Sequence, residues 1–269
     1  MAESTRSKLF IPDPVPSEHQ LFQQAKKKLQ NGGHLLLRDV PKDLALPLIE
    51  GLDSDPRIGS EGKYRYNYED KTLIAFIPTK IHDSLQYALQ DLLEHMVDRN
   101  LLSWNQFKRL KMKTDYRTTR GHVKQPDFEL KVDGRQRPGI SPECPIWVNE
   151  SGWTEGKAAL DRDISKWLVE TGYGVLLAIE TKFNPRTGSR VAGYVIFHSN
   201  NGTRTVRKSI FPTPQNPADD QITYTRQELF GDALALESGQ SHGDTYVLDV
   251  SILRRRAAAE AQKMNLTPV

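Results

Sequence analysis

The chain has 269 residues, of which 37% are hydrophobic and 26% charged, and lysine plus arginine exceed aspartate plus glutamate by only 37 to 34. This length can bury the core of one large domain or of two small ones. The near balance of charge selects no class of partner. No apolar run approaches the roughly 20 residues that cross a bilayer, so we expect no membrane partner.

Two further features indicate the compartment. The N-terminus lacks the apolar centre of a secretory signal peptide. The single cysteine, Cys144, excludes an internal disulfide and fits a reducing environment. We therefore expect an intracellular protein, cytoplasmic or nuclear, in which Cys144 is structural.

The N-terminal region is expected to be a small mixed extension. Residues 1–16 carry three prolines and resemble a loose tail. Ser17 is placed to cap the helix that follows. The predicted elements are a helix at 17–30, a strand at 34–40, a helix at 43–52, and a hairpin with strands at 63–68 and 72–77.

The clearest helix of the chain is predicted at 80–99. Apolar residues recur there at spacings of three and four, which places them on one face. These residues are Ile81, Leu85, Ala88, Leu89, Leu92, Leu93, Met96 and Val97. We expect this face to pack against a sheet.

A basic segment follows at 106–124, in which Asp115 is the single acid. We interpret it as a strand with a basic outer face. Such a face can neutralise phosphates with release of counterions. An ordinary solvated edge, whose lysines discourage edge pairing, explains the pattern about equally well. The candidate nucleic-acid-binding residues are Lys108, Lys111, Lys113, Arg117, Arg120 and Lys124.

The centre of the chain is predicted to be two strands, a helix and a third strand. The strands at 125–130 and 145–150 carry Asp127 and Glu150, joined by a loop rich in proline and glycine. Thr154 is placed to cap a helix at 155–171. The nearly continuous apolar run at 175–179 is typical of a strand covered on both faces and reached by a crossover helix.

The C-terminal region is predicted to be largely strands. Residues 190–199 and 203–211 flank Asn200-Asn201-Gly202, a hairpin signal. A last strand is expected at 246–250 and a charged helix at 251–263.

Asp127 and Glu150 suggest a metal site. Two carboxylates on neighbouring strands offer the hard oxygen ligands that Mg²⁺ or Mn²⁺ prefers. Such a metal polarises a phosphate and activates a water, and a nearby lysine can stabilise the developing charge.

The order of these elements and motifs resembles the PD-(D/E)XK, or restriction-endonuclease-like, nuclease superfamily, and more narrowly an uncharacterised branch common in fungi. The resemblance covers about residues 64–183, with weaker similarity in 222–231 and in the last strand and helix. Its motifs are Ile77-Pro78-Thr79, His82-Asp83, Pro126-Asp127, Glu150, Gly152, Thr154-Glu155, Leu160, Asp163 and Trp167-Leu168.

The resemblance implies roles for particular residues. Asp127 and Glu150 would be catalytic metal ligands, and Asp83 would supplement them from the helix. Alternatively, Asp83 is simply an acid favoured at a helix start.

This sequence departs from the superfamily pattern at Gly152, where the signature has lysine. Lys157, Lys166 and Lys182 could substitute. We favour Lys157 as the third catalytic residue, because its helical position points it toward the sheet.

These inferences define the expected protein. The fold class is α/β, with a restriction-endonuclease-like core (α-β-β-β-α-β) of a mixed central sheet flanked by helices. The predicted divisions are a tail at 1–16, an extension at 17–62, the core at 63–183, and a β extension with a terminal helix at 184–269. The function suggested is Mg²⁺- or Mn²⁺-dependent hydrolysis of nucleic-acid phosphodiesters. The alternative is an inactive module of the same fold that binds nucleic acid or protein. Whether the chain forms homo-oligomers does not follow from the sequence.

Overall fold

The computed structural model describes residues 17–30, 35–59, 62–77, 80–113, 122–135, 139–153, 156–172, 174–199 and 202–269. The chain divides into two compact units, Met1–Ile77 and Pro78–Val269. The predicted core at 63–183 extends across this division, because the hairpin at its start belongs to the first unit. None of the helices within the described ranges combines the length and apolar character needed to cross a membrane.

The first unit contains two helices and a small antiparallel sheet. Its elements are α1 (Glu18–Gln30), β1 (Leu35–Leu37), α2 (Lys42–Asp53), β2 (Lys63–Asn67) and β3 (Thr72–Phe76). Strand β3 pairs with both β1 and β2. Ser17 accepts a hydrogen bond from the backbone N–H of Gln20 and so caps α1, as predicted.

The second unit is built on a mixed sheet of seven strands in the order β10-β9-β8-β7-β6-β4, with β13 beside β9. Strands β7 and β8 are parallel, β13 is parallel to β9, and the other neighbours are antiparallel. The helices and strands in chain order are α3 (Lys80–Asp98), α4 (Trp104–Arg109), β4 (Leu110–Lys113), β5 (His122–Lys124), β6 (Phe128–Val132), β7 (Trp147–Gly152), α5 (Lys157–Glu170), β8 (Leu177–Arg186), β9 (Arg190–Ser199), β10 (Arg204–Phe211), β11 (Gln221–Thr225), α6 (Arg226–Phe230), β12 (Thr245–Asp249), α7 (Val250–Lys263) and β13 (Thr267–Pro268).

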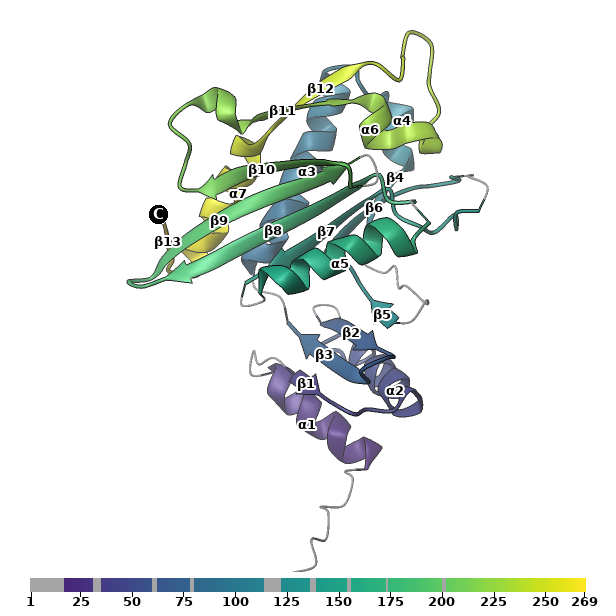
Figure 1. Ribbon diagram of the computed structural model, residues 1–269, viewed down its shortest axis with the longest axis vertical. Helices are drawn as coiled ribbons and strands as arrows, with labels where there is room; N and C mark the ends of the chain where they lie inside the picture. The colour runs from purple at the N-terminus through teal and green to yellow at the C-terminus, as the bar shows by residue number, and fades with distance from the viewer. Residues whose placement is uncertain are drawn as a thin grey trace, which may run out of the picture. The chain divides into compact units, whose positions relative to one another are not determined.

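The parallel step between β7 and β8 requires a crossover, and α5 provides it. Figure 1 shows α5 on one face of this sheet and α3 with α7 on the other. The α5 face is covered by a small apolar cluster that includes Ile164, Trp167 and Leu168. The opposite face packs into the large core to which the apolar stripe of α3 belongs, as the sequence predicted. The predicted α/β class is therefore confirmed.

The basic segment differs from its prediction as one strand. It begins as helix α4 and continues as the short strand β4, while residues 114–121 lie outside the described ranges. The helix forms because Ser103 and Gln106 make a reciprocal capping box. Helix α5 also starts later than predicted, after Gly156, which gives no side-chain cap. The expected cap, Thr154, is not among the described residues.

Arg254 of helix α7 makes a buried ion pair and also bonds to strand β10 of the sheet. Arg254 donates two hydrogen bonds of 2.6 Å to the carboxylate of Asp220 and others to the backbone oxygens of Ser209 and Ile210. Both side chains are about nine-tenths buried. Removing one partner of such a pair leaves the other charge buried without compensation.

We predict that Arg254→Ala lowers the free energy of unfolding by about 3–5 kcal/mol, measured by urea denaturation. Arg256→Ala is the matched control, because Arg256 makes a similar two-bond pair with Asp91 on the protein surface. An exposed pair contributes about 0–1 kcal/mol. Equal losses for the two variants would contradict the structural role assigned to Arg254.

Candidate functional site

Two glutamates lie side by side beneath α5. In the parallel register of β7 and β8, Glu150 is paired with Glu180 and Gly152 with Lys182. Parallel neighbours lie about 4.8 Å apart across the sheet. Both glutamates have 0% of their surface exposed, so each carboxyl group requires partners inside the protein.

Glu150 obtains a partner from the helix above it. Its Oε1 accepts a hydrogen bond of 2.5 Å from the indole Nε1–H of Trp167 in α5. Trp167 is itself buried within the apolar cluster between α5 and the sheet. The indole therefore lies against the carboxyl group that the sequence assigned to metal binding.

Asp127 lies immediately before β6, next to the residues that flank Glu150. Its backbone N–H donates to the oxygen of Asn149, and its Oδ2 accepts from the N–H of Ser151 at 2.6 Å. Asp127 thus contacts the residues on both sides of Glu150. Its other carboxylate oxygen, Oδ1, is buried and has no hydrogen-bond partner among the described residues.

The third predicted acid does not join this pair. Asp83 is exposed in the first turn of α3, and α3 packs against the sheet face opposite α5. Over the described ranges, no group of three or more His, Cys, Asp or Glu residues could hold a metal ion. Mg²⁺ also keeps several waters when bound to protein, whereas Glu150 is fully buried against an indole. In this arrangement Glu150 is engaged by the indole and is not open to such a metal.

The position of the signature lysine is occupied by other side chains. A Cβ atom at Gly152 would lie 2.7 Å from Leu160 Cδ1 and 3.3 Å from Lys182 Cδ. The first distance is too short, so a side chain at residue 152 would require the end of the Leu160 side chain to move. The ammonium of Lys182, on the strand beside Gly152, donates to the backbone oxygen of Trp153 at 2.8 Å.

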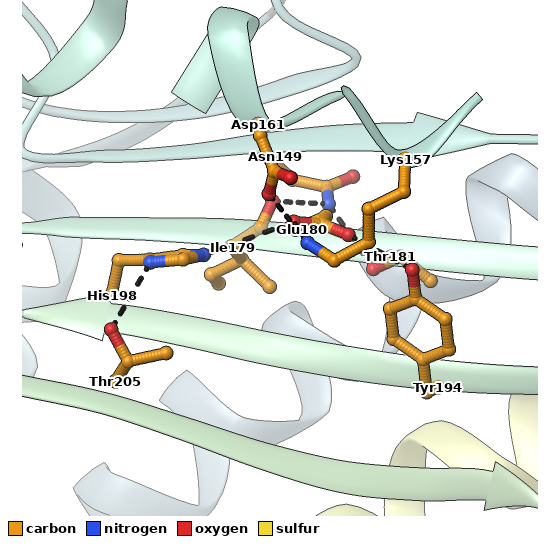
Figure 2. Close-up of polar contacts among 9 residues, drawn as sticks. All are labelled: Asn149, Lys157, Asp161, Ile179, Glu180, Thr181, Tyr194, His198 and Thr205. Atoms are coloured by element: carbon orange, nitrogen blue, oxygen red, sulfur yellow. Dashed lines mark hydrogen bonds and ion pairs between the residues drawn. The ribbon is translucent and has the colours of Figure 1, made fainter. Parts of the chain in front are cut away.

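Lys157 points toward the sheet, as predicted, but its partner there is Glu180. Its Nζ lies 3.3 Å from Glu180 Oε2 and also donates to Asp161 one turn further along α5. Strand β9 supplies two more neighbours of Glu180: Tyr194 donates to Oε1 at 3.2 Å, and His198 Nε2 lies 3.9 Å from Oε2. Figure 2 shows these side chains reaching toward Glu180.

This environment changes the proton affinity of each group. Burial raises the pKa of Glu180, and the nearby ammonium of Lys157 only partly offsets that effect. Burial lowers the pKa of His198, and the charge of Lys157 lowers it further. Burial alone would lower the pKa of Lys157, but the hydrogen bond to Asp161 and the charge of Glu180 raise it. Groups with displaced pKa values in one cluster are frequent at functional sites.

Sequence reasoning missed Glu180 and Trp167 as partners in this site. Glu180 precedes Lys182 in a Glu-x-Lys triplet, which is not a specific signal because the same pattern also occurs at Glu129 and Glu155. A usable signal was present, because Glu180 is an acid directly after the apolar run of a central strand. Such a position requires a buried partner.

The predicted nucleic-acid-binding residues are only partly described. Lys108 and Lys111 are exposed on α4 and β4, and Lys111 Nζ donates to the backbone oxygen of Lys108. The side chains of Lys113 and Lys124, and all of Arg117 and Arg120, lie outside the described residues. Arg109 turns back to the backbone oxygen of Asp133.

Comparison with known proteins adds no assignment. No family model matches the chain, and no curated protein matches it.

The bond between Trp167 and Glu150 generates a stability prediction. Trp167→Phe keeps a large ring but removes the donor, which leaves a buried carboxyl oxygen without its hydrogen bond. We expect a loss of about 1–3 kcal/mol of unfolding free energy, the usual cost of removing the partner of a buried hydrogen-bonding group, by urea denaturation.

Trp147→Phe is the matched control for that substitution. Trp147 is equally buried, and its Nε1–H donates to the backbone oxygen of Leu229, an uncharged acceptor. A bond of that kind contributes about 0.5–1.5 kcal/mol. A loss for Trp167→Phe no greater than that for Trp147→Phe would show that Glu150 does not depend on the indole.

The raised pKa of Glu180 generates a pH prediction. Between the ordinary glutamate pKa of 4.5 and the higher pKa of Glu180 in the folded protein, the folded protein holds a proton that the unfolded chain has lost. Stability from this group is therefore present at low pH and falls as the pH rises through that window. We expect wild type to gain stability relative to Glu180→Gln when the pH falls from 8 to about 4.5, measured by denaturation at each pH.

Asp161→Asn is the control for the pH series. Asp161 contacts the same lysine, but its side chain is 49% exposed. The difference in unfolding free energy between Asp161→Asn and wild type should vary less with pH. If the difference in unfolding free energy between wild type and Glu180→Gln did not change with pH, that result would contradict a raised pKa of Glu180.

Proposed function

We propose that this chain is a nucleic-acid-binding module with a restriction-endonuclease-like core that does not hydrolyse its ligand. The proposed core consists of α3, β4, β6, β7, α5 and β8, with α4 and β5 as additions. This order agrees with the α-β-β-β-α-β arrangement of the superfamily that the sequence resembles. Fold alone does not imply activity, so the proposal rests on the site.

The observation that carries the proposal is the hydrogen bond from Trp167 to fully buried Glu150. A hydrolytic carboxylate must reach the phosphate, or a metal bound to it, from an open position. Glu150 instead contributes to the packing of α5 on the sheet. Gly152, where the signature has lysine, removes a second catalytic group and cannot accept a larger side chain without movement of Leu160.

Binding is supported by the basic run in α4 and β4, which follows α3. Residues 104–113 contain Lys108, Arg109, Lys111 and Lys113 and no acid. The side chains of Lys108 and Lys111 are exposed. Exposed lysines without nearby acids in sequence can neutralise phosphates and release counterions.

A metal-dependent phosphodiester hydrolase, using Mg²⁺ or Mn²⁺, is the second candidate. It is favoured by one observation: Oδ1 of Asp127 is buried without a partner among the described residues. This function would require Glu150 to leave the indole of Trp167.

The binding proposal predicts a salt effect. Each phosphate contact that is lost should reduce the slope of log K against log [salt] by about 0.9 on duplex DNA or about 0.7 on a single strand. The double variant Lys108→Ala/Lys111→Ala should therefore bind more weakly and show a shallower slope, measured by fluorescence anisotropy with labelled oligonucleotides.

Lys27→Ala/Lys28→Ala is the control with the same change of charge, because both of these lysines are exposed on α1. It should leave the slope unchanged. The same oligonucleotides are incubated with Mg²⁺ or Mn²⁺, using wild type and Asp127→Asn. Cleavage by wild type that Asp127→Asn abolishes would support the second candidate. Failure of wild type to bind at low salt would refute the binding proposal.

A further inference from the structure

Helix α4 presents an aromatic ring to solvent. Trp104 is 60% exposed, the highest value among the large exposed hydrophobic side chains within the described ranges, shared only with Val169. Its ring is stacked on Phe107, with centroids 5.1 Å apart and planes 15° apart. Phe107 in turn packs against the large core. The indole is therefore supported from beneath by the protein while much of its surface remains in water.

The helix under this ring is firmly held. Ser103 and Gln106 close its first turn with a capping box. The Gln106 amide, which is almost fully buried, exchanges hydrogen bonds of 2.8 and 3.0 Å with the amide of Gln240. Buried Arg226 donates to the backbone oxygen of Leu101 just before the helix. A ring on such a support loses little conformational entropy when it binds a ligand.

Exposed lysines follow the ring along the chain. Trp104 and Lys108 are four residues apart on α4, a spacing that makes them neighbours on a helix surface. Lys111, which follows the helix, bonds through its Nζ to the backbone oxygen of Lys108. An exposed ring on the same segment as exposed lysines matches a ligand that carries planar bases on a phosphate backbone.

We propose that Trp104 stacks on a base of single-stranded nucleic acid while Lys108 and Lys111 contact the adjacent phosphates. This inference rests on the proposed function and specifies its ligand. The base faces of a duplex are covered by their neighbours, whereas an unpaired strand leaves them available to an aromatic ring. The chain should therefore bind a single strand more tightly than a duplex of the same length.

The test measures the affinity of the full chain for a labelled oligothymidylate and for a duplex of equal length. Loss of one stacked base costs about 1–3 kcal/mol, which corresponds to roughly 5- to 150-fold in Kd. Trp104→Leu should lose affinity for the single strand by that factor, and Trp104→Phe should recover much of it. Tyr87→Leu, at another exposed aromatic residue, is the control and should bind as wild type does. Denaturation of each variant checks that it is folded.

The outcomes separate the two proposals. Single-strand binding that is unchanged in Trp104→Leu, but weakened in Lys108→Ala/Lys111→Ala, would overturn base stacking and leave the binding function standing. Equal loss of duplex and single-strand affinity in Trp104→Leu would overturn the single-strand preference. Absence of binding by wild type to either probe would refute both proposals.

Discussion

The arrangement of the second unit depends on how charged groups are accommodated beneath α5. The sheet contributes the buried carboxyl groups of Glu150 and Glu180, and α5 contributes an indole N–H and an ammonium to them. Apolar packing by Ile164 and Leu168 presses the helix onto the sheet, but the polar contacts fix where along the strands it lies. Because losing a hydrogen bond inside the protein is costly, a shift of α5 is opposed by the bond from Trp167 to Glu150 and by the contact of Lys157 with Glu180. Burial of Glu150 and Glu180 beneath α5 is therefore part of how this helix packs on the sheet.

Much of the fold could be predicted from sequence, because regular patterns determine it. The apolar stripe of α3 and the hairpin signal between β9 and β10 each correspond to the element that the structure shows. Helix α4 was not predicted, because the run of basic residues was interpreted as a strand and the capping box of Ser103 with Gln106 was not used. The boundary after Ile77 was missed for another reason: hairpin β2–β3 is completed by β1, and such pairing between distant segments leaves no local signal.

The site was less predictable than the fold. Two successive strands suggested that Asp127 and Glu150 would be neighbours, and the backbone contacts of Asp127 to Asn149 and Ser151 place them so. The pairing of Glu150 with Glu180 depends on the register of two parallel strands joined by a whole helix, which no local pattern specifies. The role of Trp167 depends on how α5 is rotated about its axis. The spacing of apolar residues shows which face of the helix is buried, but not which residue of the sheet each side chain on that face contacts.

The close packing at Gly152 has a consequence for substitution at that position. A side chain introduced there would meet the end of the Leu160 side chain and Lys182 Cδ, and the indole of Trp167 would still engage Glu150. Positions 152 and 160 are therefore coupled: a larger residue at 152 requires Leu160 to move or to be replaced by a smaller residue, so the effects of the two substitutions on stability should not add.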